Sequence, residues 1–223
     1  MQLVLGNKRY SSWSLRPWLV MRCFEIPFEE TVIPLDTPEF AARIGELSGS
    51  RRVPVLIDGD LHVWDSLAII ETLADWFPER AIWPAERAAR AHARVIASEM
   101  HSGFAALRTA CPMNVLLEAP FQGWGGEATA KDVRRIVELW ADARARFGAP
   151  SGAGPFLFGA FTAADAMYAP VTTRLTSYGW PLDEGARAYC EAVQDLPAFR
   201  EWKAAAAAEP WVLPATEAVA KRA

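Results

Sequence analysis

The chain has 223 residues, 52% of them hydrophobic, and a formal net charge of −4 at pH 7. This describes a globular protein of one large or two small domains, and the absence of lysine- or arginine-rich runs excludes the basic surface that nucleic acid or an anionic membrane would need. No apolar run approaches the ~20 residues of a membrane span, and the amino-terminal one is too short for a signal peptide, so we expect a cytoplasmic protein that binds small molecules.

Strand and helix signals alternate along the first third of the chain. QLVL (2–5) predicts a strand, the amphipathic run 15–24 a helix, and FEETVI (28–33) a second strand. A second helix is expected over 37–47, because a capping threonine is followed by proline at the first helical position.

Two short strands and a helix complete this region. VPVLID (53–58) and LHVW (61–64) are joined by an Asp-Gly turn, which predicts an antiparallel hairpin. The helix SLAIIETLADWF (66–77) follows, with Asp65 or Ser66 as its cap. The expected order is β-α-β-α-β-β-α, an α/β domain.

The rest of the chain predicts helices. PERAIWP contains two prolines and no clear period, which indicates a linker. We expect the helices that follow, separated by proline- and glycine-containing breakers, over 85–108, 129–147, 163–178, 184–193 and 197–208. The sequence therefore predicts an α/β domain over 1–78, a linker over 79–84 and an all-helical domain over 85–223.

This order of elements is similar to that of the glutathione transferases, whose N-terminal domain has a thioredoxin-like fold. SGSRRVPVLIDGDLHVWDSLAIIETL (48–73) resembles the family pattern of Val-Pro, a hairpin, an acidic or amide residue, Ser and an apolar helix. The resemblance implies that the bond between Val53 and Pro54 is cis and that the Val53 backbone pairs with the cysteinyl backbone of glutathione. An ordinary proline at a strand edge is the alternative interpretation.

Asp65 and Ser66 stand at the start of a helix, where free N–H groups and the helix dipole favour a carboxylate ligand. The resemblance places the γ-glutamyl group of glutathione here. Ser66 would bind its carboxylate, and Asp65, where relatives often carry Gln or Glu, would pair with its ammonium. The same side chains can also serve as an ordinary helix cap, and the two roles are compatible.

The stretch SSWSLRPW (11–18) lies where the family places the glutathione sulfur, between the first strand and the first helix. A hydroxyl donor and a helix N-terminus lower a thiol pKa of about 8.5 by roughly one to two units. The stretch resembles the SSCSxRVR signature of zeta-class transferases, which assigns the thiolate to Ser11, whereas counting back from Arg16 as in theta-like relatives selects Ser12. We favour Ser11 and interpret Ser14 as a helix cap; serines that only cap the helix are the alternative.

Trp13 replaces the cysteine of the zeta pattern. Serine cannot form a mixed disulfide with glutathione, which argues against a thiol-redox activity and leaves conjugation or glutathione-assisted isomerisation.

A later segment, RVIASEMHSGFAALR (94–108), resembles the zeta-class segment IACDIHPLNNLR, with His101 and Arg108 matched by position. Met100, Phe104 and Arg108 are four residues apart, so on one helix they would share a side. With Trp13 they would border the electrophile site, where the guanidinium can hold a carboxylated substrate. Core packing with a surface arginine is the other interpretation.

Other signals bear on folding rather than chemistry. Thr162 and Asp165 have the spacing of a capping box, which the family also carries. The three cysteines are widely separated and predict reduced core thiols, and the scattered histidines predict no metal site. Relatives form two-fold dimers through the helices at 66–77 and 85–108, so we expect a homodimer. The candidates for the contact are Trp76-Phe77 and the arginine edge of the second helix, made of Arg87, Arg90 and Arg94.

The sequence is thus identified as a glutathione S-transferase, zeta-like or a bacterial relative, with glutathione as cosubstrate, no metal and a small electrophile as the second substrate. Two alternatives remain open. One is a glutathione-dependent cis-trans isomerase of the maleylacetoacetate or maleylpyruvate type, and the other is a non-catalytic transferase-like binding module.

Overall fold

A computed structural model describes residues 1–148 and 154–220 of the chain. Its sheet has four strands in the order β2-β1-β3-β4. The strands are β1 (Gln2–Leu5), β2 (Glu29–Val32), β3 (Val55–Asp58) and β4 (Leu61–Val63). β1 and β2 are parallel, and β3 is antiparallel to both β1 and β4. With the helices between the strands, this confirms the predicted β-α-β-α-β-β-α order.

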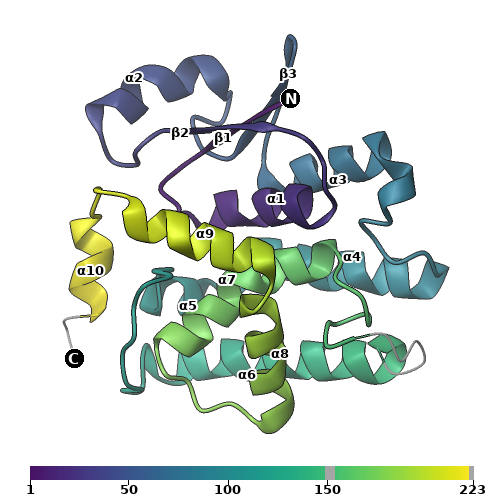
Figure 1. Ribbon diagram of the computed structural model, residues 1–223. Coiled ribbons are helices and arrows are strands. Elements are labelled where there is room, and N and C mark those ends of the chain that lie inside the picture. Colours follow the sequence, from purple (N-terminus) through teal and green to yellow (C-terminus); the bar gives the residue numbers. More distant parts are fainter. Residues whose placement is uncertain (149–153, 221–223) are drawn as a thin grey trace.

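Three helices flank the sheet: α1 (Ser12–Cys23), α2 (Pro38–Leu47) and α3 (Ser66–Trp76). Side chains alternate along β1, so Leu3 and Leu5 enter the large core that contains residues of α1 and α3. Val4 points the other way, into a small cluster packed against Phe40 of α2. α2 therefore covers one face of the sheet, and α1 lies between the other face and the helical region (Figure 1).

The second part of the chain is mainly helical, as predicted. Its helices are α4 (Arg87–Ser102), α5 (Ala105–Ala110), α6 (Gly126–Ala143), α7 (Ala163–Ser177), α8 (Glu184–Gln194), α9 (Pro197–Ala208) and α10 (Pro214–Ala220). A 3-10 turn, η1 (Pro78–Arg80), lies in the predicted linker, and a π-helical turn, η2 (Arg144–Gly148), extends α6. Residues 149–153, in the predicted breaker after α6, are outside the described residues. α7 packs against α1, α4 and α8 and is buried except at Thr176.

The predicted single helix over 85–108 is wrong. α4 ends at Ser102 because Gly103 is extended, and Phe104, with a left-handed φ of 56°, precedes α5. Met100 and Arg108 therefore lie on different helices, and the expected stripe of Met100, Phe104 and Arg108 does not exist. The short helix α10 was also missed.

The capping box of α7 is confirmed. The two oxygens of Asp165 accept hydrogen bonds from the N–H of Leu157 at 3.0 Å, from the N–H and hydroxyl of Thr162 at 2.8 and 3.0 Å, and from the hydroxyl of Tyr189 at 3.0 Å. Burial raises the pKa of Asp165 to about 6, although these donors oppose the shift. Asp165 thus connects the start of α7 to α8 and to the preceding loop.

Among the described helices, none combines the length and the apolar character needed to cross a membrane.

Candidate functional site

The three motifs singled out from the sequence meet at one end of the sheet. Val4 of β1 pairs with Val55 of β3, so the Val53–Pro54 pair lies where β1 ends. β4 runs antiparallel to β3 and ends at Val63, which brings the Asp65–Ser66 pair to the same end. The start of α1 follows β1 here as well. The antiparallel register therefore gathers residues that are more than forty positions apart in the chain.

The hydroxyls at the start of α1 have different partners. Ser11 is the N-cap residue without a capping hydrogen bond, and its hydroxyl donates to Ser14 Oγ at 2.7 Å. Ser14 also accepts from the N–H of Gly6 at 3.1 Å, so the prediction that it caps the helix is wrong: it lies in the first turn and ties α1 to the end of β1. Ser12 Oγ accepts from the guanidinium of Arg174 at 3.2 Å. The proton of Ser11 is therefore engaged, whereas that of Ser12 is available to donate.

The peptide bond between Val53 and Pro54 is cis, as the resemblance implied. Within the described part of the chain, the backbone of Val53 forms no hydrogen bond to other backbone groups. Its N–H and C=O can therefore pair with an extended peptide laid beside the sheet.

At the start of α3, Asp65 and Ser66 differ in their hydrogen bonding. Asp65 is the N-cap and accepts from the N–H groups of Leu67 at 3.1 Å and Ala68 at 3.4 Å. Ser66 is fully buried, and its Oγ has no hydrogen-bond partner among the described residues. A buried hydroxyl without a partner costs about 1–3 kcal/mol, and beside the helix N-terminus it is well placed to donate to a carboxylate.

A chain of contacts joins α3 to the helical region. Asp65 Oδ2 lies 3.0 Å from His101 Nε2 on α4, and the His101 ring meets the Trp13 ring edge-on with 5.3 Å between centroids. The guanidinium carbons of Arg16 and Arg108 lie 4.0 and 5.0 Å from the Trp13 ring centroid. Trp13, in the first turn of α1, thus contacts residues of α4 and α5 and is linked to the start of α3 through His101.

The structure brings together two of the four residues predicted for the electrophile pocket. Trp13 and Arg108 are in contact, and both are partly exposed. Met100 is fully buried in the hydrophobic core, and Phe104 is nearly so at 7% exposure. Met100 and Phe104 are therefore core residues and do not line an open pocket.

Two buried arginines in this region were missed as site residues. Arg16 donates to the backbone carbonyls of Met167 at 3.0 Å and Ser12 at 3.1 Å, and Arg174 donates to that of Cys111 at 2.6 Å. Arg16, Arg108 and Arg174 take part in no ion pair formed by the described residues. The sequence around Arg174, VTTRLTS, contains no acidic residue three or four positions away that could pair with it on a helix. This could have identified Arg174 as an unpaired cation.

The electrostatics of these arginines follow from burial and mutual repulsion. Burial lowers the pKa of Arg16 well below its usual range, and the charges of Arg174 and Arg108 lower it further. Burial likewise lowers the pKa of Arg174 to about 10, with the charge of Arg108 adding to the effect. Unpaired buried cations are costly, so this end of α1 is suited to an anionic ligand.

The loop before α1 is held by the C-terminal segment, a contact that nothing in the sequence indicated. Glu209 accepts from the N–H groups of Lys8 at 2.8 Å and Arg9 at 3.2 Å. Glu217 of α10 accepts from the Tyr10 hydroxyl at 2.7 Å and pairs with Arg9 at 2.9 Å. Residues immediately before the serines are thus fixed from the far end of the chain.

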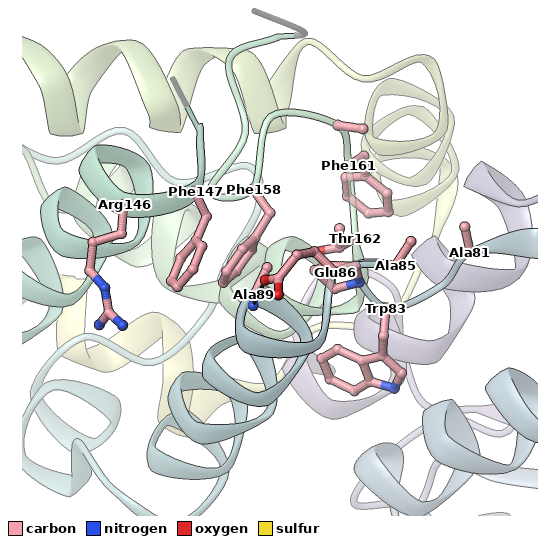
Figure 2. Close-up of a pocket in the computed structure, with 12 residues that line it drawn as sticks. Ala81, Trp83, Ala85, Glu86, Ala89, Arg146, Phe147, Phe158, Phe161 and Thr162 are labelled. Carbon is pink, nitrogen blue, oxygen red and sulfur yellow. Dashed lines mark hydrogen bonds between the residues drawn. The ribbon is translucent and has the colours of Figure 1, made fainter. Parts of the chain in front are cut away.

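A separate cavity of about 570 Å³ lies at the N-terminal end of α4. Figure 2 shows Phe147 and Phe158 side by side on one flank of it, with Trp83 and Phe161 elsewhere on its wall. Glu86, which caps α4, lies about 22 Å along the helix from His101 at 1.5 Å per residue. This cavity contains none of the predicted site residues.

No group of three or more His, Cys, Asp or Glu side chains suited to a metal ion occurs in the described residues.

Comparison with family models matches both parts of the chain. Residues 10–76 match the model described as "Glutathione S-transferase, N-terminal domain", and residues 87–205 match "Glutathione S-transferase, C-terminal domain". The second match alone spans more than half of the chain.

Three similar proteins are 22–30% identical to this chain over the matched residues. A Caenorhabditis elegans protein named "Probable maleylacetoacetate isomerase" is 30% identical over 116 residues, 52% of this chain and 53% of that protein, so the match spans about half the length of this curated relative. A glutathione transferase homologue from Burkholderia with bound glutathione has a TM-score of 0.71 at 22% identity, over 93% of this chain and 98% of its own. A bacterial maleyl pyruvate isomerase of the zeta class has a TM-score of 0.67 at 22% identity, over 96% and 100%. These two structures share the fold.

Proposed function

We propose, on the premise that the chain belongs to the glutathione S-transferase family, that it is an enzyme that binds glutathione and activates its thiol for attack on a small electrophile. The observation that carries this proposal is the buried Ser66 hydroxyl, which has no hydrogen-bond partner in the described residues and stands at the N-terminus of α3. A residue needed only for folding would be expected to have its polar atom satisfied.

Glutathione would lie across the end of the sheet where the three motifs meet. Its γ-glutamyl carboxylate would accept from Ser66 and from the N-terminus of α3, and its ammonium would pair with Asp65, whose side chain is 54% exposed. Its cysteinyl backbone would pair with Val53 beside the cis bond to Pro54. The sulfur would then point toward the start of α1.

The hydrogen bonds at the start of α1 favour Ser12 over Ser11 as the donor to the thiolate. Ser11 already donates to Ser14, whereas Ser12 accepts from Arg174 and keeps its own proton for the sulfur. This reverses the preference drawn from the zeta-class signature and agrees with the count from Arg16. Positive charge on Arg16 and Arg174 would lower the thiol pKa further.

The second substrate would meet Trp13 and Arg108. The Trp13 ring supplies an apolar wall, and Arg108 is half-buried and forms no ion pair with any described residue. Because its guanidinium is only partly used, in a hydrogen bond to Gly103 O at 3.1 Å, it can bind a carboxylate of the electrophile. We therefore propose a small, carboxylated electrophile.

The same features support the alternative, a glutathione-dependent cis-trans isomerase. Both the C. elegans relative and the bacterial zeta-class structure are named as isomerases, of maleylacetoacetate and of maleyl pyruvate. In that reaction glutathione adds to the substrate and leaves again, so it is not consumed. Measuring whether glutathione disappears during turnover separates conjugation from isomerisation.

We also propose a cytoplasmic homodimer, with domains divided at the linker 79–84. The arginine edge of α4 is partly used within the chain, since Arg94 pairs with Glu71 of α3 at 2.9 Å. Val95 beside it is 58% exposed, which leaves an apolar side chain for a contact between subunits. Sedimentation at micromolar concentration tests the dimer.

Calorimetric titration with glutathione and with S-methylglutathione tests the central proposal. Both should bind with dissociation constants in the micromolar to millimolar range, because most of the contacts are made by groups other than the thiol. Absorbance of the bound thiolate against pH should then give a thiol pKa below about 8.5. Failure of both peptides to bind would favour the non-catalytic module.

Single variants then assign the thiol contact. Ser12→Ala should raise the pKa of the bound thiol by roughly one unit, the equivalent of about 1.4 kcal/mol. Ser11→Ala, the matched control one residue away, should leave it nearly unchanged. A shift in Ser11→Ala alone would return the role to Ser11.

A further inference from the structure

Arg174 connects the helical region to the serine cluster. It lies on α7, yet its Nη2 donates to Ser12 Oγ at 3.2 Å across 162 residues of chain. Its Nη1 donates to the carbonyl of Cys111 at 2.6 Å and more weakly to that of Arg108 at 3.4 Å. The guanidinium is thus fixed at one end by backbone and bonded at the other to a single side chain.

Burial prevents Arg174 from touching a ligand itself. The residue is 5% exposed, and its Nε has no hydrogen-bond partner among the described residues. Its influence on a molecule bound at the sheet end must therefore pass through Ser12 or through its electric field.

The hydrogen bond from Arg174 determines what the Ser12 hydroxyl can do. A hydroxyl that accepts from a charged donor has one lone pair committed, and its O–H is polarised and free to rotate toward another acceptor. Among the described residues, no carboxylate is hydrogen-bonded to the Ser12 hydroxyl, whose partner is the Arg174 guanidinium. The Ser12 carbonyl accepts from Arg16, and the charge of Arg108, on α5, also acts on Arg16. The carboxylate of Asp65 contacts His101 and an N–H group at the start of α3, and its exposed side remains open to the ammonium of glutathione.

We propose that Arg174 is a positioning residue that holds Ser12 Oγ as a hydrogen-bond donor toward the glutathione sulfur. This inference rests on the proposed function, because it assumes that the sulfur lies beside Ser12. It assigns to the helical region a part in activating the thiol, which Arg174 of α7 plays through Ser12.

A double-mutant cycle with Ser12 tests the proposal. Arg174→Gln keeps amide donors for the Cys111 carbonyl and removes the charge, and it should raise the pKa of the bound thiol by about one unit. In a Ser12→Ala background the same substitution should shift the pKa by less than half as much, because the group through which Arg174 acts is gone. Arg174→Lys should give a smaller shift than Arg174→Gln, since the charge is retained.

S-methylglutathione separates the possible failures. Its binding should change less than about threefold in every Arg174 variant, because it has no ionisable thiol and Arg174 does not contact the peptide. If the wild-type protein binds neither S-methylglutathione nor glutathione, the proposed function fails. If it binds both and Arg174→Gln leaves the thiol pKa unchanged, or shifts it equally in the two backgrounds, the role of Arg174 is overturned while the proposed function stands.

Folding of the variants does not limit the test. Should Arg174→Gln fail to fold, the cycle is run with Arg174→Lys, whose smaller shift must again depend on the Ser12 hydroxyl. Arg22→Gln provides the matched control: it removes a charge from the exposed side of α1, where Arg22 pairs with Glu201, and should leave the titration unchanged. An equal shift in the control would mean that total charge matters rather than the bond to Ser12.

Discussion

The starts of α7 and α3 are each built from an acidic residue and a hydroxyl, and they use these groups in opposite ways. At α7, Thr162 and Asp165 satisfy each other, and both carboxylate oxygens accept hydrogen bonds. At α3, Asp65 caps the helix alone, and Ser66 Oγ is buried without a partner in the described residues. The first arrangement stabilises the fold, whereas the second reduces stability and leaves a donor for a ligand.

The serines in the first turn of α1 show the same contrast between a hydroxyl used by the fold and one that keeps a free donor. Ser14 accepts from the N–H of Gly6, which attaches the helix to the end of β1, and from the Ser11 hydroxyl, while Ser12 accepts from Arg174 and keeps its proton. Chemical type and position at a helix start therefore do not separate structural hydroxyls from those that we propose to be functional. What separates them is whether the rest of the fold supplies every partner.

The largest effect is expected from Asp165→Ala, which removes the acceptor shared by buried donors of Leu157, Thr162 and Tyr189. The free energy of unfolding should fall by roughly 3–5 kcal/mol, because each buried donor left unsatisfied costs about 1–3 kcal/mol. Urea unfolding measures it.

Thr37→Ala is the control for an ordinary cap. Thr37 Oγ accepts from the N–H of Phe40 at 3.1 Å at the partly buried start of α2, so its loss should cost about 1 kcal/mol. An equal cost for Thr37→Ala and Asp165→Ala would remove the special structural role given to the start of α7.

Ser14→Ala should have the next largest effect. The buried N–H of Gly6 would lose its acceptor, and the Ser11 hydroxyl would have to find another, which should lower the free energy of unfolding by about 2 kcal/mol. Urea unfolding again gives the measurement. A variant as stable as the wild type, with a shifted thiol pKa, would show that Ser14 belongs with the functional hydroxyls.

Ser66→Ala should change binding rather than stability. It removes a buried hydroxyl that has no described partner, so the free energy of unfolding should stay within about 0.5 kcal/mol of the wild type or rise slightly. The dissociation constant for glutathione should increase roughly tenfold, which is about 1.4 kcal/mol. Calorimetry alongside urea unfolding tests both parts, and unchanged binding would remove Ser66 from the site.

Asp65→Asn should have the smallest effect. Asn caps helices as well as Asp, so stability should change by less than about 0.5 kcal/mol. Glutathione should bind about two- to threefold more weakly, because an exposed ion pair contributes at most about 1 kcal/mol. Asp65→Ala is the comparison variant. It removes the helix cap as well as the charge, so the free energy of unfolding should also fall by about 1 kcal/mol. A large loss of binding in Asp65→Asn would mean that the contact with His101 matters more than we propose.

The sequence by itself determined the elements and the motifs that local signals specify. The Thr37-Pro38 start, the Asp-Gly hairpin and the capping box at Thr162 all rest on residues within a few positions of each other. The spacing from Val53 to Ser66 is also a local signal. A two-strand hairpin returns the chain to where it began, so the Val53–Pro54 and Asp65–Ser66 pairs lie at one end of the sheet.

Only the tertiary structure decided which hydroxyl keeps its proton. Ser11 and Ser12 are adjacent and chemically identical, and the partner that distinguishes Ser12 comes from Arg174, 162 residues away. The break between α4 and α5 likewise depends on the left-handed backbone of Phe104, a residue type that seldom adopts it, although Gly103 beside it is a local signal for the end of a helix. Periodicity and capping rules describe neighbours along the chain, whereas these outcomes depend on partners that meet only when the two parts of the molecule pack together.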